Sequence, residues 1–267
     1  MRSFHAFPLV AACALVAAGC SDGATGPSVE ANSVTAFLPS HSALRGKLQQ
    51  ILEEENGGLG FEMWATILDR NGLVVDVVFS GENRGDQWPG SRVISAQKAN
   101  TGNAFSLEGF ALSSANLYAA VQPGGSLFGL QESNPVDPEV AYGGNASSFG
   151  TNHDFMIGKR IGGINVFGGG LALYTPGERL IGGIGLSGDT ACTDHIIAWK
   201  LRHSLNLDNV PAGVAPGSLT GTDNIIYAIG MIDGFEHPTC FDTPDQGNHV
   251  TIANNLPTTH PVGPDED

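Results

Sequence analysis

Two histidines and a tryptophan near residue 200 are the side chains best suited to chemistry in this sequence. His195, Trp199 and His203 recur every four residues, which places them on one face of a helix. Two turns separate the histidines by about 12 Å, too far for both to bind one metal ion. One of them, His195 first, could ligate a haem iron while Trp199 packs on the macrocycle. The alternative is a helix with partly buried histidine and tryptophan.

Two further side chains are weaker candidates for binding. His153, beside Asp154, could be a metal ligand, and the nearby Met156 is more typical of packing. Lys98 lies among alanines in the middle of an expected helix, where its charge could contact an acidic ligand. It could equally extend to solvent along its own aliphatic stem.

Glycines 183, 185 and 188 satisfy the pattern G-x-G-x-x-G between an expected strand and an expected helix. That pattern alone indicates dinucleotide binding, but the strand looks like the second half of a hairpin, and no convincing parallel strand follows. The backbone N–H groups here could still hold a carboxylate or propionate. The sequence has no G-x-S-x-G, H-E-x-x-H or P-loop lysine motif, so hydrolase, zinc-protease and NTPase functions lack their usual motifs.

The N-terminus has the features of a bacterial lipoprotein signal. Arg2 precedes an apolar stretch over residues 9–18, and small residues lead to Cys20. The apolar stretch is shorter than the roughly 20 residues that a permanent membrane helix needs. We therefore expect residues 1–19 to be removed, Cys20 to be lipidated, and residues 20–40 to be a flexible tether. The protein would then lie in the cell envelope, facing the periplasm or the exterior, with its lipid as the only membrane contact.

Export also determines how the four cysteines are interpreted. Cys13 lies in the signal and Cys20 is expected to carry lipid, which leaves Cys192 and Cys240. A pair in an oxidising compartment is more often a disulfide than two reactive thiols. This disulfide would attach the C-terminal residues to the helix that contains His195.

The formal net charge is −15, from 12 basic and 27 acidic residues. So few cations argue against nucleic-acid binding, which requires neutralisation of phosphates. They argue equally against electrostatic docking on anionic lipid. The acidic surface is consistent with simple solubility.

The hydrophobic pattern predicts a layered domain over residues 41–206. Two hairpins imply an antiparallel sheet, and segregated helices imply an α+β fold. An irregular excursion lies before the second hairpin, and residues 207–267 form a C-terminal extension with one short edge strand near 224–232 and a frayed end after 257. The expected elements are a helix over 41–56, strands over 61–68 and 73–79, helices over 91–107 and 113–121, the excursion over 127–160, strands over 163–174 and 180–187, and a helix over 190–205.

Three motifs occur in the order found in a known family. They are Trp64-Ala-Thr-Ile-Leu-Asp-Arg-Asn-Gly72-Leu-Val-Val, then Ser95-Ala-Gln-Lys98-Ala-Asn-Thr101, then Leu180-Ile-Gly-Gly-Ile-Gly-Leu-Ser-Gly188 followed by Asp194 and Ala198. Each motif alone is weak, but the ordered set is fairly specific. The chain resembles the GlcG/HbpS-like haem-binding family over about residues 44–205.

The resemblance implies a profilin-like antiparallel sheet flanked by helices, assembly into homo-oligomers, and binding of haem or a related tetrapyrrole for capture, storage or sensing. Lys98, Gly183, Gly185, Gly188 and Asp194 match family positions, but the motifs transfer no iron ligand. Two alternatives stay open: binding of small organic acids without haem, and haem degradation, which is proposed for some relatives. The sequence contains no group of residues arranged for acid–base or nucleophilic catalysis of haem degradation. The long excursion and the C-terminal extension depart from the family pattern.

Overall fold

The computed structural model describes residues 36–217, 219–227, 234–241 and 248–263. The expected signal peptide, Cys20 and most of the expected tether lie outside these residues. Within them, every helix is too short or too polar to cross a membrane.

Four strands form one antiparallel sheet in the order β2-β1-β4-β3. They are β1 (Trp64–Asp69), β2 (Val74–Phe79), β3 (Gly170–Tyr174) and β4 (Leu180–Ser187), and every neighbouring pair is antiparallel. In the β1–β2 turn Gly72 has a φ of 78°, a left-handed conformation that glycine adopts without strain. The predicted α+β fold with two hairpins is confirmed.

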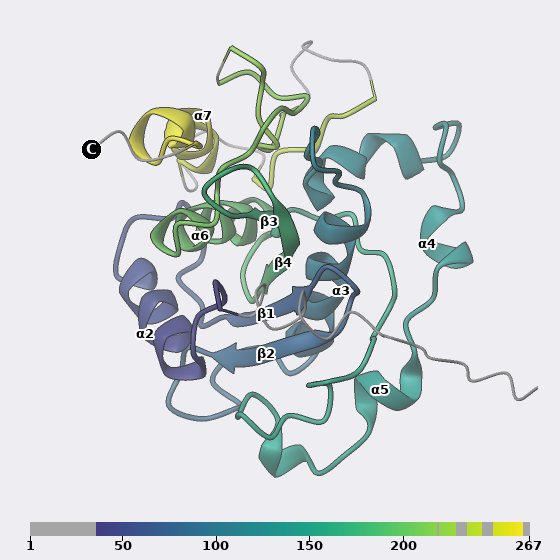
Figure 1. The fold of residues 1–267 in the computed structure, drawn as a ribbon, viewed down its shortest axis with the longest axis vertical. Helices are drawn as coiled ribbons and strands as arrows, with labels where there is room; N and C mark the ends of the chain where they lie inside the picture. Colours follow the sequence, from purple (N-terminus) through teal and green to yellow (C-terminus); the bar gives the residue numbers. More distant parts are fainter. Residues whose placement is uncertain (1–35, 218, 228–233, 242–247, 264–267) are drawn as a thin grey trace, which may run out of the picture. The chain divides into compact units, whose positions relative to one another are not determined.

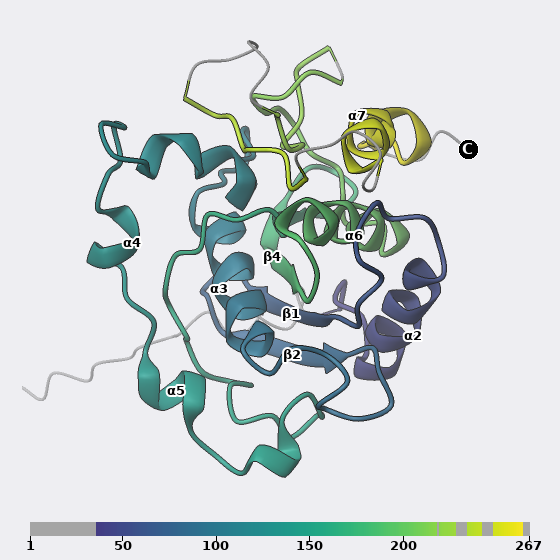
Figure 2. The same cartoon turned by 180° about the vertical axis from the view of Figure 1, so that it is seen from behind.

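Helices cover both faces of the sheet (Figures 1 and 2). One face carries α3 (Ser91–Ala104), and the other carries α2 (His41–Leu52) and α6 (Ala191–Ser204). The contact with α3 is close because β4 has glycines on that face. A Cβ at Gly183 would clash with the carbonyl of Ala99, and one at Gly185 would clash with the carbonyl of Ser95. These glycines therefore allow close packing of helix and sheet backbones.

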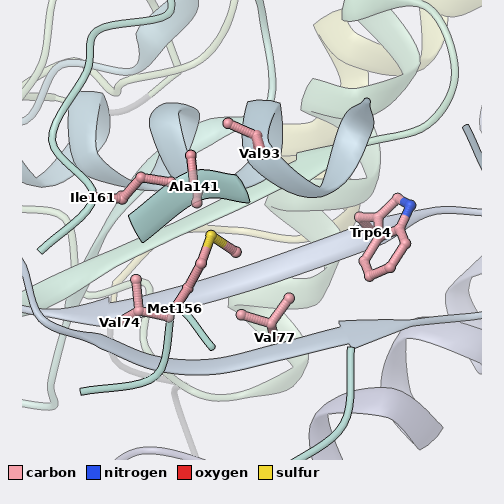
Figure 3. Packing of buried hydrophobic residues seen from close by; sticks show 8 residues of the cluster. Trp64, Val74, Val77, Val93, Ala141, Met156 and Ile161 are labelled. Atoms are coloured by element: carbon pink, nitrogen blue, oxygen red, sulfur yellow. The ribbon is translucent and has the colours of Figure 1, made fainter. Parts of the chain in front are cut away.

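The excursion, residues 127–160, packs against α3 and contributes to a hydrophobic core cluster with β1, β2 and α3. Figure 3 shows the Met156 side chain lying between β2 and Ala141 of α5. Packing, as the sequence indicated, is therefore the role of Met156. The predicted helix over 113–121 is instead two short 3-10 turns. The elements before and within the excursion are η1 (Ser114–Leu117), η2 (Ala119–Val121), α4 (Leu130–Ser133), α5 (Pro138–Tyr142) and η3 (Ala146–Ser148).

The C-terminal extension, residues 207–263, lies against α6 and ends in α7 (His249–Thr259). The sequence predicted a frayed end after residue 257, but α7 continues to Thr259, so the prediction is wrong for these residues. The helix is held by burial of Ala253 and Leu256, and Pro257 lies in its last turn. The predicted edge strand is also wrong within 224–227, where Tyr227 makes only an isolated bridge to His237. Residues 228–232 lie outside the described part.

Candidate functional site

Helix α6 carries the face on which the predicted ligands lie. Thr190 caps its N-terminus by accepting a hydrogen bond from the backbone N–H of Thr193. Residues 192–202 are all buried, although the helix covers only one face of the sheet. A helix buried on all sides needs further cover, and here α2 with the loop after it and the C-terminal extension supply it.

His195 is fully buried beneath the extension. Its Nε2 accepts from the backbone N–H of Ile225 at 3.0 Å and lies 3.2 Å from Asn224 Oδ1. Its Nδ1 has no hydrogen-bond partner among the described residues. Burial lowers the pKa of His195 to about 3, so the ring is neutral, which is the form that binds metal ions.

Trp199 and His203 share the face of His195, as the spacing predicted. The Trp199 indole N–H donates to the carbonyl of His260 at 2.8 Å. His203 Nδ1 lies 2.7 Å from Asp208 Oδ2. All three side chains therefore contact the extension.

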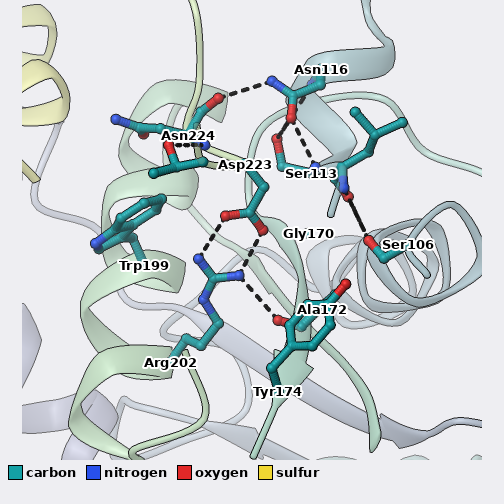
Figure 4. A network of polar contacts seen from close by, with 12 residues as sticks. Ser106, Ser113, Asn116, Gly170, Ala172, Tyr174, Trp199, Arg202, Asp223 and Asn224 are labelled. Carbon is teal, nitrogen blue, oxygen red and sulfur yellow. Dashed lines mark hydrogen bonds and ion pairs between the residues drawn. The ribbon is translucent and has the colours of Figure 1, made fainter. Parts of the chain in front are cut away.

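A buried ion pair on the same helix escaped the sequence analysis. Arg202 binds both carboxylate oxygens of Asp223, at 2.6 and 2.8 Å, and donates to the carbonyl of Ala172 at 3.1 Å (Figure 4). The guanidinium also lies 5.0 Å from the Trp199 ring. The sequence signal was weak: Arg202 follows Trp199 by three residues, but nothing in the sequence named Asp223 as its partner.

The predicted disulfide is confirmed, joining Cys192 in the first turn of α6 to Cys240 in the extension. His237, one of the histidines that the sequence offers as possible ligands, lies near this attachment. It packs against the Tyr118 ring, and burial lowers its pKa to about 4. The extension is thus joined to α6 from its first turn to its last.

Lys98 and Asp194 form a second buried ion pair, with Lys98 Nζ 2.6 Å from Asp194 Oδ2. The other Asp194 oxygen accepts from the backbone N–H groups of Gly188 and Asp189. Burial raises the pKa of Asp194 to about 6 and lowers that of Lys98. The groups expected to hold an acidic ligand are therefore already paired with an internal carboxylate.

His153 lies apart from this site, exposed on the excursion. The adjacent Asp154 is buried and pairs with Arg92 of α3, which also stacks on Phe149. No cluster of three or more His, Cys, Asp or Glu within the described ranges could hold a metal ion.

Two hollows lie near α6. One of about 360 Å³ is mostly apolar, lies within the extension, and is bounded partly by Asn224 and Ile225, the two residues that contact His195. The other, of about 330 Å³, lies between the end of α2 and the start of α6. Its lining includes four carboxylates: Glu54, Glu55, Glu62 and Asp189.

Residues 43–201, from α2 to α6, match the family described as "Haem degrading protein HbpS-like". The match spans more than half of the 267 residues. The chain belongs to this family. The HbpS-like region thus ends inside α6, and the C-terminal extension lies beyond it. No curated protein matches the chain.

Two solved structures resemble this member of the HbpS-like family. The crystal structure of Klebsiella pneumoniae protein ORFY, of family DUF336, is 21% identical with a TM-score of 0.42, over 62% of this chain and 90% of that one. A PduOC:heme complex is also 21% identical, with a TM-score of 0.41, over 67% of this chain and 93% of that one.

The side chains on the α6 face are suitable for binding haem, but the docked extension leaves no room for it. A neutral imidazole and an adjacent indole are a suitable donor and apolar wall. However, His195 and Trp199 are at most 1% exposed, and Asn224, Ile225 and His260 occupy the positions facing them. With the extension docked, a macrocycle has no place against this face in the described structure.

Proposed function

We propose that this protein binds haem or a related tetrapyrrole on the α6 face, in a state in which the C-terminal extension has moved away. The observation that carries the proposal is His195, a buried neutral imidazole within the residues that match the HbpS-like family, whose Nε2 lone pair accepts a backbone N–H of the extension and becomes available to iron when the extension leaves. Family membership supports the ligand class, and the side chains of α6 support the place.

His195 would supply the donor to iron and Trp199 the apolar wall. His203 is hydrogen-bonded to Asp208, and Lys98 forms an ion pair with Asp194, so both side chains already have partners before any ligand binds. Because Lys98 and the Gly188 N–H are both committed to Asp194, no observation favours the organic-acid alternative. The proposal concerns binding and not turnover.

A haemin titration tests this proposal. The mature protein, oxidised and after treatment with dithiothreitol, is titrated while the Soret band is followed. We expect a saturable shift in at least one redox state, with affinity reduced at least tenfold in His195→Ala. His153→Ala is the matched control and should bind like the wild type, because His153 is exposed on the excursion.

The absence of a saturable shift in both redox states would contradict haem binding. Equal affinity in wild type and His195→Ala would place any haem elsewhere on the molecule.

The cellular setting is part of the same proposal. A lipid on Cys20 would hold the protein at a membrane facing the periplasm or exterior, where it could capture, store or sense haem, and we expect it to form homo-oligomers. The disulfide supports an oxidising compartment. The mass of the mature N-terminal peptide tests the anchor: a diacylglyceryl Cys20 is expected, and an unmodified one would contradict it.

A further inference from the structure

Several polar contacts and one disulfide join the extension to one face of α6. A disulfide lies at the first turn, His195 follows, then the Trp199–His260 hydrogen bond, and the Arg202–Asp223 and His203–Asp208 pairs lie at the last turn. Such contacts contribute less net stability than their number suggests, because each exchanges for water when it opens. A buried ion pair is likewise weak evidence of net stabilisation.

The same interface holds the unsatisfied polar groups of the molecule. Six buried side-chain atoms in the described ranges have no hydrogen-bond partner, and all six belong to α6 or to the extension. Each such atom costs free energy relative to a hydrated state. They are His195 Nδ1, Arg202 Nε, Asn209 Nδ2, Asn209 Oδ1, Tyr227 Oη and His237 Nε2. The polar groups of α6 and of the extension are therefore incompletely satisfied while the extension is docked.

The disulfide offsets this cost. Cys192 and Cys240 are 48 residues apart, so the bond keeps the extension close to α6 and reduces the entropy gained when it leaves. Only this contact is covalent, and a dithiol can reverse it.

We propose that the C-terminal extension is an autoinhibitory cover for the α6 face, and that reduction of Cys192–Cys240 releases it. A dithiol reductant donates two electrons and two protons, the S–S bond becomes two thiols, and the reductant becomes a disulfide. Release exposes His195 and Trp199 while the sheet, α3 and the excursion stay folded. The use of the exposed face for haem rests on the proposed function, but the release itself does not.

Chemical modification of histidine tests the release without any ligand. Diethyl pyrocarbonate is applied to the oxidised wild type and to the Cys192→Ser/Cys240→Ser variant, and modification of each histidine is read by peptide mass spectrometry. We expect His195 to react at least tenfold faster in the variant. His153, already exposed, should react at the same rate in both and serves as the internal control.

Dithiothreitol treatment of the wild type provides a second route that needs no substitution. Reduction should raise His195 reactivity, and reoxidation should restore protection, with an unchanged far-UV circular dichroism spectrum throughout. Persistent protection of His195 with both thiols free and the spectrum native would overturn the inference. Loss of the native spectrum would also overturn it, because the extension would then be part of the folding core.

The haemin titration separates the two proposals. If His195 becomes reactive and haemin still does not bind, release of the extension is supported and the proposed haem binding is contradicted. If haemin binds equally well with His195 protected, the cover inference fails, and haem binds elsewhere.

Discussion

Two of the three helices that flank the sheet, α3 and α6, are covered by added segments, but the covers are built differently. Over α3, the excursion contributes Ala141 and Met156 to the hydrophobic cluster that includes β2, and its Arg92–Asp154 pair is further satisfied by backbone groups. Over α6, the extension is joined by ion pairs, hydrogen bonds and a disulfide.

The two covers also differ in how well their buried polar groups are satisfied. Within the described residues, every buried side-chain polar atom without a partner belongs to α6 or to the extension, and none belongs to the excursion. Apolar burial is proportional to the area removed from water, whereas polar contacts depend on geometry that is easily left incomplete. The excursion therefore shares a core whose polar groups are satisfied. The extension also buries Val210 against β3 and β4, but it leaves its polar groups incompletely paired, which is the basis for proposing that it can be released.

Matched removal of one carboxylate from each cover should show the largest difference. Asp154→Asn and Asp223→Asn each leave a buried arginine without its anionic partner, which costs about 3–5 kcal/mol. In Asp154→Asn we expect the melting temperature of the whole domain to fall. In Asp223→Asn the loss should be confined to the extension, so limited proteolysis should cleave it while most of the domain stays resistant.

Thermal melting and proteolysis at one temperature, on the same samples, check this pair. An equal fall in melting temperature with no preferential cleavage of the extension would mean that the two covers are equivalent.

Acidification should weaken the α6 cover through its two buried histidines. Burial lowers the pKa of His195 to about 3 and of His237 to about 4. Below about pH 6.5 both histidines are therefore protonated in the unfolded protein but stay neutral in the folded protein. Asp194, with its pKa raised to about 6, acts in the opposite direction between about pH 4 and 6. Over that window the two histidines take up more protons on unfolding than Asp194 releases, so the free energy of unfolding falls as the pH decreases.

Denaturant unfolding at several values between pH 4 and 6 measures this slope. His195→Phe removes one group that takes up a proton on unfolding, so the free energy of unfolding should depend less steeply on pH. His153→Ala should leave this pH dependence unchanged. A wild-type slope retained in His195→Phe would mean that His195 is not the source.

The sequence was informative where local pattern determines structure. Alternation and the Asn71-Gly72 turn predicted both strands of the first hairpin, and four-residue spacing placed His195, Trp199 and His203 on one face. The disulfide followed from cysteine arithmetic and the inferred export. These signals lie within a few residues of one another or depend on composition, so no tertiary information was needed.

The rest depended on contacts between distant segments. Nothing near Arg202 indicates that Asp223 will neutralise it, and the helical spacing of His195 could not reveal that Asn224 and Ile225 would face it. The glycines of β4 were considered as a ligand cradle, but they serve the approach of α3. Helix α7 was missed because Pro257 argues against a helix, while burial of Ala253 and Leu256 on α6 outweighs that penalty.

Hydrogen exchange on the oxidised and reduced wild-type protein tests the central claim most directly, because it reports both covers in one experiment. We predict that reduction speeds exchange at least tenfold in peptides of the extension and of α6, while peptides of α3 and the excursion keep their protection. Equal protection of both covers after reduction, or loss of protection in both together, would contradict the account.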